Sequence, residues 1–413
     1  MRSILDDTGD VVSRLFVGNF DFEHTLAAPG AEPSRVLRRK CAELSCAWSA
    51  VASADDVILG GGMPDPDFLP ELQAMGFPEF RWETSPLNVD RRLDVCPWGW
   101  DPSVIDWCRR HGMRCNGPPL EIVRDVNARD FASHIESQSR TGLPGACRVC
   151  GLDDLDHTLR VLARATPGWV IKARFGMAGR ECLRGRGHSL DAAQRTWVVT
   201  RLERDGAVFC EPWVERIEEI SWQFDVPASP SDSTGGAPRL LGATQLVTDR
   251  RGAHRGNRLL SGDQIAADQC AEWKPVIDIV TDLAGLAQRR GYRGPLGVDS
   301  MKYRASDGTV AVRPVQDVNA RWTMGRLALE LRRQADSDAH VGWWHVRWAG
   351  RQSPRDWYQA LRDAGGASVR VVRTSPYEID GRPVELGTLA VIGADPQAVR
   401  RVERGILGPT SGD

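Results

Sequence analysis

The stretch Gly294–Gly325, GPLGVDSMKYRASDGTVAVRPVQDVNARWTMG, contains the strongest structural signal in this chain. Two runs within it, Val298–Arg304 and Thr309–Val318, are rich in the residues that favour strands. Between them, Asp307-Gly308 is a dipeptide typical of a tight hairpin turn. The stretch therefore predicts an antiparallel β-hairpin.

Two carboxylates and one amide gather on one face of this predicted hairpin. Pairing about the turn brings Asp299 opposite Asp317 to within one residue, and because side chains alternate along a strand, Asn319 shares the face of Asp317. Such oxygens suit Mg²⁺ held together with nucleotide phosphates. Arg321 continues the same face, where it could clamp a phosphate or a developing acyl phosphate. The alternative is a surface hairpin with solvated acids, although an unpaired carboxylate inside this apolar strand would be costly if buried.

A second segment, WVIKARFGMAGRECLRGRG at 169–187, places a lysine at the end of an apolar strand and two glycines in the following loop. Lys172 can neutralise phosphates, while the backbone N–H groups near Gly176 and Gly179 approach them. Only four residues of the chain are lysine, against 49 arginines, so this lysine stands out. The spacing is not that of a P-loop. An ordinary β-turn is the alternative.

A third segment, FCEPWVERIEEISWQFDV at 209–226, joins two apolar strands through an acidic connection. Glu211 and Trp213-Val214 form a connection with apolar walls that can hold an adenine. The following Glu219, or Glu218 in its place, can accept hydrogen bonds from ribose hydroxyls. An acidic loop between two strands is the alternative.

Composition excludes several classes of protein. The 413 residues carry 26% charged and 41% hydrophobic residues, which is typical of a globular chain of two to three domains. A net charge of −2 gives no reason to expect nucleic acid as a partner. No apolar run is long enough for a membrane helix, and the acids in MRSILDDTGD argue against a signal peptide. Ten scattered cysteines favour a cytoplasmic protein with reduced thiols.

Local motifs exclude further sites. Cys147 and Cys150 form a single C-x-x-C without a second pair at zinc spacing, which argues against structural zinc. The chain contains no G-x-S-x-G elbow and no H-E-x-x-H pair, so serine-hydrolase and zincin chemistry is excluded.

The periodicity predicts an α/β arrangement followed by a β-rich region. Residues 116–119 form a turn-rich break, and the polar segment 227–238 is expected to be a flexible loop. A disordered tail is expected at the end of the chain. The predicted strands are 15–18, 57–59, 169–174, 207–214, 221–226 and 240–248; the predicted helices are 33–52, 102–111, 125–137 and 273–290.

Taken in order, the three segments resemble the ATP-grasp superfamily, typified by D-alanine–D-alanine ligase and biotin carboxylase, over residues 116–325. The family's first phosphate-binding lysine corresponds to Arg129, which is a departure, and its second corresponds to Lys172, with Gly176 and Gly179 in the loop. The resemblance assigns the hinge and ribose positions to Glu211, Trp213, Val214 and Glu219. It assigns the metal ligands to Asp299, Asp317 and Asn319. At position 317 the family's glutamate is replaced by the shorter aspartate. It assigns the arginine that follows to Arg321.

The resemblance implies an α/β chain with an ATP-grasp fold: a Rossmann-like preATP domain at 1–115, a nucleotide-binding core at 116–330 with a β-rich lid at about 130–212, and an extension at 331–413 that completes the C-terminal α+β lobe. It implies an ADP-forming ligase that uses ATP and Mg²⁺, or Mn²⁺, to activate a small carboxylate as an acyl phosphate for attack by an amine or thiol. Arg321 and Lys172 are the expected catalytic residues, and a homodimer is compatible with the family. The alternatives are a nucleotide-binding protein with lost catalysis and a phosphotransferase.

Overall fold

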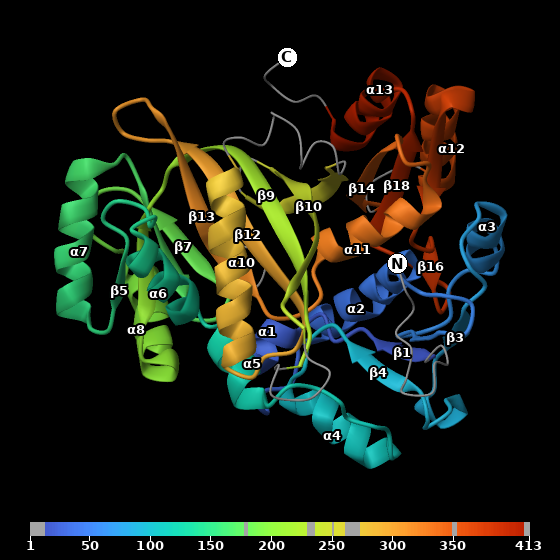
Figure 1. Ribbon diagram of the computed structural model, residues 1–413, viewed down its shortest axis with the longest axis horizontal. Coiled ribbons are helices and arrows are strands. Elements are labelled where there is room, and N and C mark those ends of the chain that lie inside the picture. Colours follow the sequence, from blue (N-terminus) through green and yellow to red (C-terminus); the bar gives the residue numbers. More distant parts are fainter. Residues whose placement is uncertain are drawn as a thin grey trace.

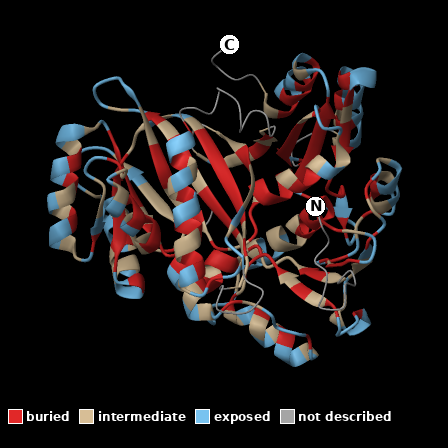
Figure 2. Ribbon diagram, viewed as in Figure 1, coloured by how far each residue is buried: buried red, intermediate tan, exposed pale blue. Residues whose placement is uncertain are grey.

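The computed structural model describes residues 13–176, 181–228, 236–249, 252–260, 273–348 and 353–408. Figure 1 shows a mixed α/β architecture in which helices cover several separate sheets. The α/β class predicted from the sequence is therefore confirmed. Strands of the large central sheet are buried, whereas the covering helices alternate buried and exposed positions (Figure 2). That alternation is expected for amphipathic helices packed on a sheet. In the described part of the chain, no helix is both long and apolar enough to cross a membrane.

The first part of the chain forms a four-stranded parallel sheet in the order β3-β2-β1-β4. Its helix α4 begins where the Asp101 side chain accepts a hydrogen bond from the Val104 backbone N–H, and it ends at Gly112, whose φ is +67°. The Asp101 side chain satisfies a backbone N–H that has no partner within the first turn, and glycine readily adopts the left-handed conformation that ends a helix. The elements are β1 (Arg14–Val17), α1 (Phe22–Ala27), α2 (Arg35–Leu44), β2 (Val57–Leu59), α3 (Phe68–Ala74), β3 (Arg81–Glu83), β4 (Asp94–Pro97) and α4 (Pro102–His111).

A second four-stranded sheet, in the order β5-β8-β6-β7, follows two helices that pack against β13 of the large sheet. Its core is apolar and is built from this sheet and from helices α7 and α8, on the left of Figure 1. The elements are α5 (Leu120–Asn127), α6 (Arg129–Ser139), β5 (Cys147–Val149), α7 (Leu152–Ala165), β6 (Trp169–Ala173), β7 (Cys182–Gly185), α8 (Ala192–Asp205) and β8 (Val208–Pro212).

The largest sheet has eight strands in the order β13-β12-β9-β10-β11-β14-β18-β15. Helix α10 packs against β9, β12 and β13, while α12 and α13 cover the strands from the end of the chain. The elements are β9 (Glu215–Val226), β10 (Arg239–Thr248), β11 (His254–Leu259), α10 (Lys274–Arg289), β12 (Gly294–Arg304), β13 (Val310–Asn319), α11 (Met324–Glu330), β14 (His340–Arg347), α12 (Pro354–Gly365), β15 (Val369–Arg373), β16 (Glu378–Ile379), β17 (Arg382–Pro383), β18 (Leu386–Gly393) and α13 (Pro396–Leu407).

Two helix predictions were wrong. The helix predicted at 125–137 is two helices, because the chain turns into an extended conformation at Ala128. Asn127 stabilises this break by accepting a hydrogen bond from the backbone N–H of Ala320. The helix predicted at 33–52 ends at Leu44 and continues as a 3₁₀ helix, Ser45–Ala50, whose residues are all buried. Most of the predicted flexible loop, at 229–235, and the tail at 409–413 lie outside the described residues.

A cluster of buried charged side chains links the first part of the chain to the last strands of the large sheet. The guanidinium of Arg373, on β15, is fully buried and lies 2.9 Å from Asp65 and 2.8 Å from Glu71. It also lies over the ring of Tyr377, 4.0 Å from the centroid. Because the two acids belong to the first part of the chain, this cluster links segments about 300 residues apart.

Candidate functional site

The β12–β13 hairpin forms as predicted and brings the candidate metal ligands together. Asp299 pairs directly with Asp317, and Asn319 pairs with Gly297. The amide nitrogen of Asn319 donates a hydrogen bond to Asp299 at 3.2 Å. The hydroxyl of Ser221, on the neighbouring strand β9, donates to the other oxygen of Asp299 at 2.5 Å. The predicted hairpin is therefore confirmed, and Asp299 lies opposite Asp317 as predicted to within one residue.

Asp299 is partly buried between Ser221 and Asn319, and its pKa is perturbed. Burial, together with the negative charges of Asp317 and Glu219, raises the pKa of Asp299 to about 7, although the Ser221 hydrogen bond and the charge of Arg321 oppose the shift. Neighbouring carboxylates of this kind favour a bound cation, because a cation removes their mutual repulsion.

The donor set fits one divalent cation. Two aspartate carboxylates and the oxygen of Asn319 are hard oxygen ligands, which Mg²⁺ and Mn²⁺ prefer. Within the described ranges, no three His, Cys, Asp or Glu side chains gather closely enough to hold a metal ion, so Asn319 is needed as the third protein ligand. A site with few protein ligands leaves positions for water and phosphate oxygens, as is usual for Mg²⁺.

Arg321 lies at the same end of the hairpin. It donates a hydrogen bond to the Asn319 amide oxygen at 2.9 Å and forms a close ion pair with Glu23 of α1. Its guanidinium also lies over the ring of Trp98, 5.3 Å from the centroid. Burial raises the pKa of Glu23, and the charge of Arg321 opposes that rise. The arginine is thus already bound to a carboxylate contributed by the first part of the chain.

Arg129 reaches the hairpin from the first residue of α6. Its guanidinium lies 3.3 Å from the Asp317 carboxylate and donates a second hydrogen bond to the backbone oxygen of Ala173, at 3.0 Å. Gly176 lies against it, since a Cβ atom on this glycine would come within 2.7 Å of the guanidinium. Gly179, the second predicted glycine of this loop, lies outside the described residues.

A small cavity of about 10 Å³ separates these groups, which is room for about one water molecule. Residues from the first part of the chain, from the helix pair, from the glycine loop and from β13 all contribute to its wall. They are Glu23, Asn127, Arg129, Phe175, Gly176, Asp317, Val318 and Asn319.

Lys172 belongs to a buried network of alternating charge. Its ammonium lies 2.7 Å from Glu211, which also accepts hydrogen bonds from Arg313 at 3.0 Å. Arg313 in turn binds Glu136 of α6 at 2.5 and 2.9 Å. Burial opposes the ionisation of Glu211, but Arg313 and Lys172 outweigh it and lower its pKa. Burial lowers the pKa of Lys172, and Glu211 opposes that shift.

This network forms part of the wall of a larger cleft, of about 370 Å³, between α6, β8 and β13. That volume lies within the usual range for small-molecule sites. Phe209 and Cys210 contribute the apolar wall, while Glu211, Arg313 and Gln316 contribute polar groups.

The predicted hinge and ribose residues follow β8. The backbone N–H of Trp213 donates to Gly168, and the Arg184 guanidinium lies 4.0 Å from the centroid of the Trp213 ring. Val214 is half-buried against the apolar cluster formed by Leu143, Met301 and Tyr303.

Glu219 is buried on β9 and faces the candidate metal ligands. Its carboxylate accepts hydrogen bonds from Thr248 at 2.9 Å and from Gln316 at 3.0 Å, and it pairs with Arg216 at 2.9 Å. It also raises the pKa of Asp299. A ribose role for Glu219 remains a prediction.

Sequence reasoning missed four residues of this region: Glu23, Ser221, Arg313 and Glu136. Arg313 had a signal, because an arginine within the apolar run VAVRPV must find a buried partner. Glu23 and Glu136 lie on helices far from the hairpin in sequence, and no local pattern marked them.

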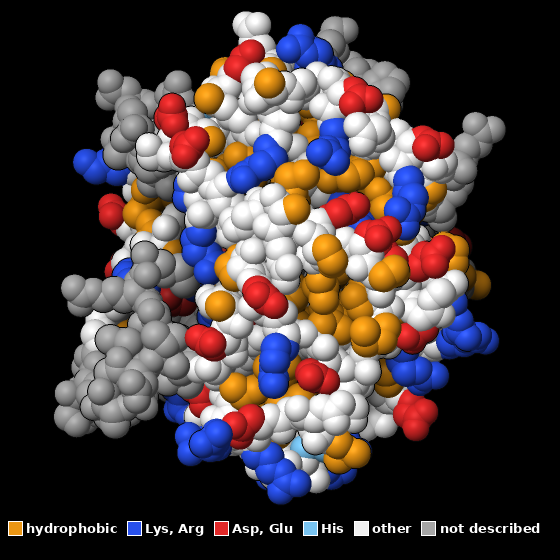
Figure 3. Space-filling model, turned by 90° about the vertical axis from the view of Figure 1, so that its right-hand side faces the viewer, with side chains coloured by type: hydrophobic (Ala, Val, Ile, Leu, Met, Phe, Trp, Pro, Cys, Tyr) orange, Lys and Arg blue, Asp and Glu red, His pale blue; other side chains and the backbone are white. Residues whose placement is uncertain are grey.

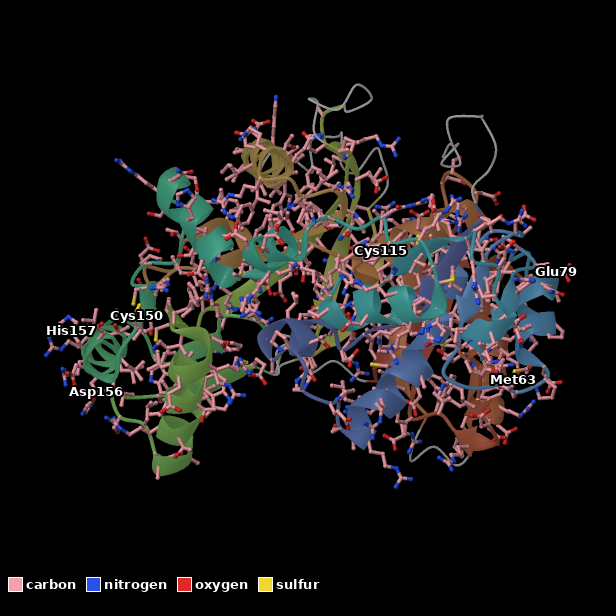
Figure 4. The ribbon with its side chains drawn as sticks, turned by 90° about the horizontal axis from the view of Figure 1, so that it is seen from below. Met63, Glu79, Cys115, Cys150, Asp156 and His157 are labelled. Carbon is pink, nitrogen blue, oxygen red and sulfur yellow. The ribbon has the colours of Figure 1, made fainter. Side chains whose placement is uncertain are left out.

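The peripheral cysteines form no site in the part of the chain that the structure describes. Cys150 is exposed and accepts a hydrogen bond from Arg148, and Cys115 lies far from it (Figure 4). On the face shown in Figure 3, basic and acidic side chains are interspersed around a group of apolar side chains near the centre.

Comparison with known proteins gives a fold match without sequence similarity. No protein family and no curated protein matches the sequence. Among solved structures, the N5-carboxyaminoimidazole synthetase from Staphylococcus aureus complexed with ADP matches with a TM-score of 0.53 at 10% identity, covering 98% of each chain. A biotin carboxylase complex with β,γ-ATP from Campylobacter jejuni matches with a TM-score of 0.51 at 13% identity, covering 96% of this chain and 91% of that one. The biotin carboxylase domain of the Hydrogenobacter thermophilus 2-oxoglutarate carboxylase, solved with MgADP and bicarbonate, also has a TM-score of 0.51, at 14% identity, covering 96% and 89%.

Proposed function

The chain has the ATP-grasp fold, and from this fold and its site we propose that it is an ATP-dependent ligase that joins a small carboxylate to an amine or thiol. The observation that carries the proposal is the convergence of Asp299, Asp317 and Asn319 with Arg321 and Arg129. Arg129, Asp317 and Asn319 line the small cavity between the first part of the chain and the loop at Gly176, and Asp299 and Arg321 each contact Asn319 beside it. That is the charge arrangement needed to hold a metal ion, phosphates and an acyl phosphate together.

Residues 1–115 would then form the preATP domain, residues 116–330 the nucleotide-binding core, and residues 331–413 the remainder of the C-terminal lobe. The sheet order supports this division, because the strands after residue 331 extend the large sheet beyond β11.

Asp299, Asp317 and Asn319 would hold one Mg²⁺ or Mn²⁺, which neutralises phosphate charge when it is bound. The Hydrogenobacter thermophilus structure contains MgADP, which supports a Mg²⁺-nucleotide ligand. Asn319 lies beside Asp299, but its amide nitrogen faces that carboxylate while its oxygen accepts a hydrogen bond from Arg321, so the oxygen would have to turn to the metal.

The nucleotide would lie in the cleft between α6, β8 and β13, with its base beside the connection Glu211–Val214. Arg129 lines both this cleft and the small cavity beside Gly176, and Lys172, on β6, pairs with Glu211 of the cleft wall. Arg129 would then face the phosphates, and Phe209 and Cys210 of the cleft wall would face the base.

Catalysis would consist mainly of positioning and charge neutralisation, since phosphoryl transfer asks little covalent chemistry of the protein. The carboxylate oxygen of the substrate attacks the γ-phosphorus of ATP, and ADP leaves. The amine nitrogen then attacks the acyl carbon, phosphate leaves, and the amine loses a proton to water. Arg321 would hold the acyl phosphate oxygens. To do so, its guanidinium must either bind them beside Glu23 or break its ion pair with Glu23.

A second candidate function is nucleotide binding without catalysis. The observation that favours it is the small volume of the cavity, where Arg129 and Asp317 already satisfy each other.

One experiment separates the two. Calorimetric titration with a non-hydrolysable ATP analogue and Mg²⁺ should show binding, and a screen of carboxylates with amines should then show ADP release. Binding without ADP release from any pair would support the second candidate, and no binding of any purine nucleotide would refute both.

A further inference from the structure

The two residues that depart from the ATP-grasp pattern contact each other. Arg129 stands where that family has a lysine, and Asp317 stands where it has a glutamate. They lie 188 positions apart in the chain, yet the guanidinium of Arg129 and the carboxylate of Asp317 form an ion pair at 3.3 Å. The ion pair therefore joins the start of α6 to β13 at the candidate site.

Arg129 is held in this position from several sides. Its guanidinium donates to the Ala173 oxygen, and its backbone N–H donates to the Arg174 oxygen at 3.1 Å. It also fills the space beside Gly176. Its side chain is 13% exposed and that of Asp317 is 35% exposed, so water reaches the ion pair mainly from the side of the aspartate. The guanidinium thus lies where the glycine loop would present a phosphate.

The other charges around the pair have partners of their own. Arg321 is bound to Glu23, and Lys172 is bound to Glu211. Asp299 receives hydrogen bonds from Ser221 and Asn319. A phosphate that engages Arg129, or a cation that engages Asp317, must therefore separate this one ion pair.

We propose that the Arg129–Asp317 ion pair is a latch that makes metal and nucleotide bind well only together, an inference that rests on the proposed nucleotide site. A cation alone takes Asp317 and leaves the guanidinium unpaired beside the glycine loop. A nucleotide alone takes Arg129 and leaves Asp317 unpaired beside its own phosphates. When both bind, each charge gains a new partner. Coupling of this kind is reciprocal, so each ligand strengthens the other by the same factor.

The latch predicts gains of affinity, which general damage to the fold would not produce. In Arg129→Gln, Asp317 is released, and Mn²⁺ without nucleotide should bind at least about fivefold more tightly than to the unmodified chain, the lower end of typical coupling factors. In Asp317→Asn, Arg129 is released, and ADP in the presence of EDTA should bind at least about fivefold more tightly for the same reason.

Two control variants each remove a charge of the same sign as a latch residue, one a cation like Arg129 and the other an anion like Asp317. Both variants leave Arg129 and Asp317 unchanged. Arg174→Gln removes a nearby cation whose side chain binds Asp130 and the backbone oxygen of Asp205, and it should change Mn²⁺ affinity less than about twofold, because Asp317 keeps its partner Arg129. Asp299→Asn removes the other aspartate, and it should improve metal-free ADP binding less than Asp317→Asn does.

The experiment uses the full chain at pH 8. Free Mn²⁺ is measured by electron paramagnetic resonance, and ADP binding by calorimetry in EDTA. The proposal requires both gains. If either the Mn²⁺ affinity or the metal-free ADP affinity does not increase, or if the matching control shows an equal increase, the proposal is overturned.

Failure of the proposed function gives a different result. If the unmodified chain does not bind Mg²⁺ and ADP together, the nucleotide site itself is refuted. If it binds them together but neither variant gains affinity, the nucleotide site stands and the latch is refuted.

Discussion

Replacing Arg313 by methionine should destabilise the chain strongly. The arginine side chain is 3% exposed and donates four hydrogen bonds, two to Glu136 and two to Glu211, at 2.5 to 3.0 Å. Through them it connects α6, β8 and β13. Methionine has a similar length but offers no donor to either carboxylate.

The size of the effect follows from what remains buried. Lys172 still contacts Glu211 in the variant, so the loss falls mainly on Glu136, whose side chain is 8% exposed. Leaving one partner of a buried ion pair uncompensated typically costs about 3–5 kcal/mol of unfolding free energy. An effect of this size is a large part of the stability of an ordinary domain.

Urea unfolding followed by circular dichroism measures this loss as a shift of the midpoint. The double variant Arg313→Met/Glu136→Leu should recover most of it, because apolar groups can replace a buried ion pair with little loss. Arg109→Met is the matched surface control: Arg109 and its partner Asp106 are 75% and 64% exposed, so the midpoint should stay where it is. A loss below about 1 kcal/mol for Arg313→Met would refute the reasoning, since a typical hydrogen bond alone contributes that much. A double variant no more stable than the single one would refute it equally.

Three further predictions concern affinity, turnover and pH. Lys172→Ala should weaken ATP-analogue binding about 10- to 100-fold in calorimetry, because a charged hydrogen bond to phosphate contributes about 1.5–3 kcal/mol; unchanged affinity would contradict the phosphate assignment. Asn319→Ala should abolish Mg²⁺-dependent ADP release while the melting temperature stays within a few degrees, and full activity would remove Asn319 from the metal site. His345 is buried, and burial together with the charges of His254 and Arg255 lowers its pKa well below the usual value. Below its ordinary pKa, this histidine binds a proton in the unfolded chain but not in the folded chain. Its contribution to the free energy of unfolding is therefore fully present above about pH 6.5 and is lost as the pH falls below that value. Urea midpoints at pH 7 and pH 5 should differ less in His345→Phe than in the unmodified chain, and equal differences would contradict this assignment.

Local patterns in the sequence predicted several elements correctly. The strand at 57–59 and the helix at 102–111 form with the predicted limits. Both depend on features close in the chain: a short apolar run in the first case, and Asp101, Pro102 and Gly112 as helix signals in the second. The break at Ala128 was not predicted, because it depends on a contact between Asn127 and the distant residue Ala320.

The sequence by itself determined the hairpin, and it placed Asp299 opposite Asp317 to within one residue. A turn signal and a side-chain period of two are enough for this approximate pairing. The order of three short motifs was also enough to identify the ATP-grasp fold, which the structural comparison confirms.

Only the tertiary structure decided how the charges of the site are satisfied. Arg129 meets Asp317, Arg321 meets Glu23, and Arg313 meets Glu136 across 188, 298 and 177 positions of the chain. A break in the β12–β13 register between Asp299 and Met301 also changes which residue of β13 lies opposite each residue of β12, so Arg313 pairs with Met301. Local periodicity carries no information about such partners, because they depend on how separate segments pack against each other and on which buried charges must be neutralised there.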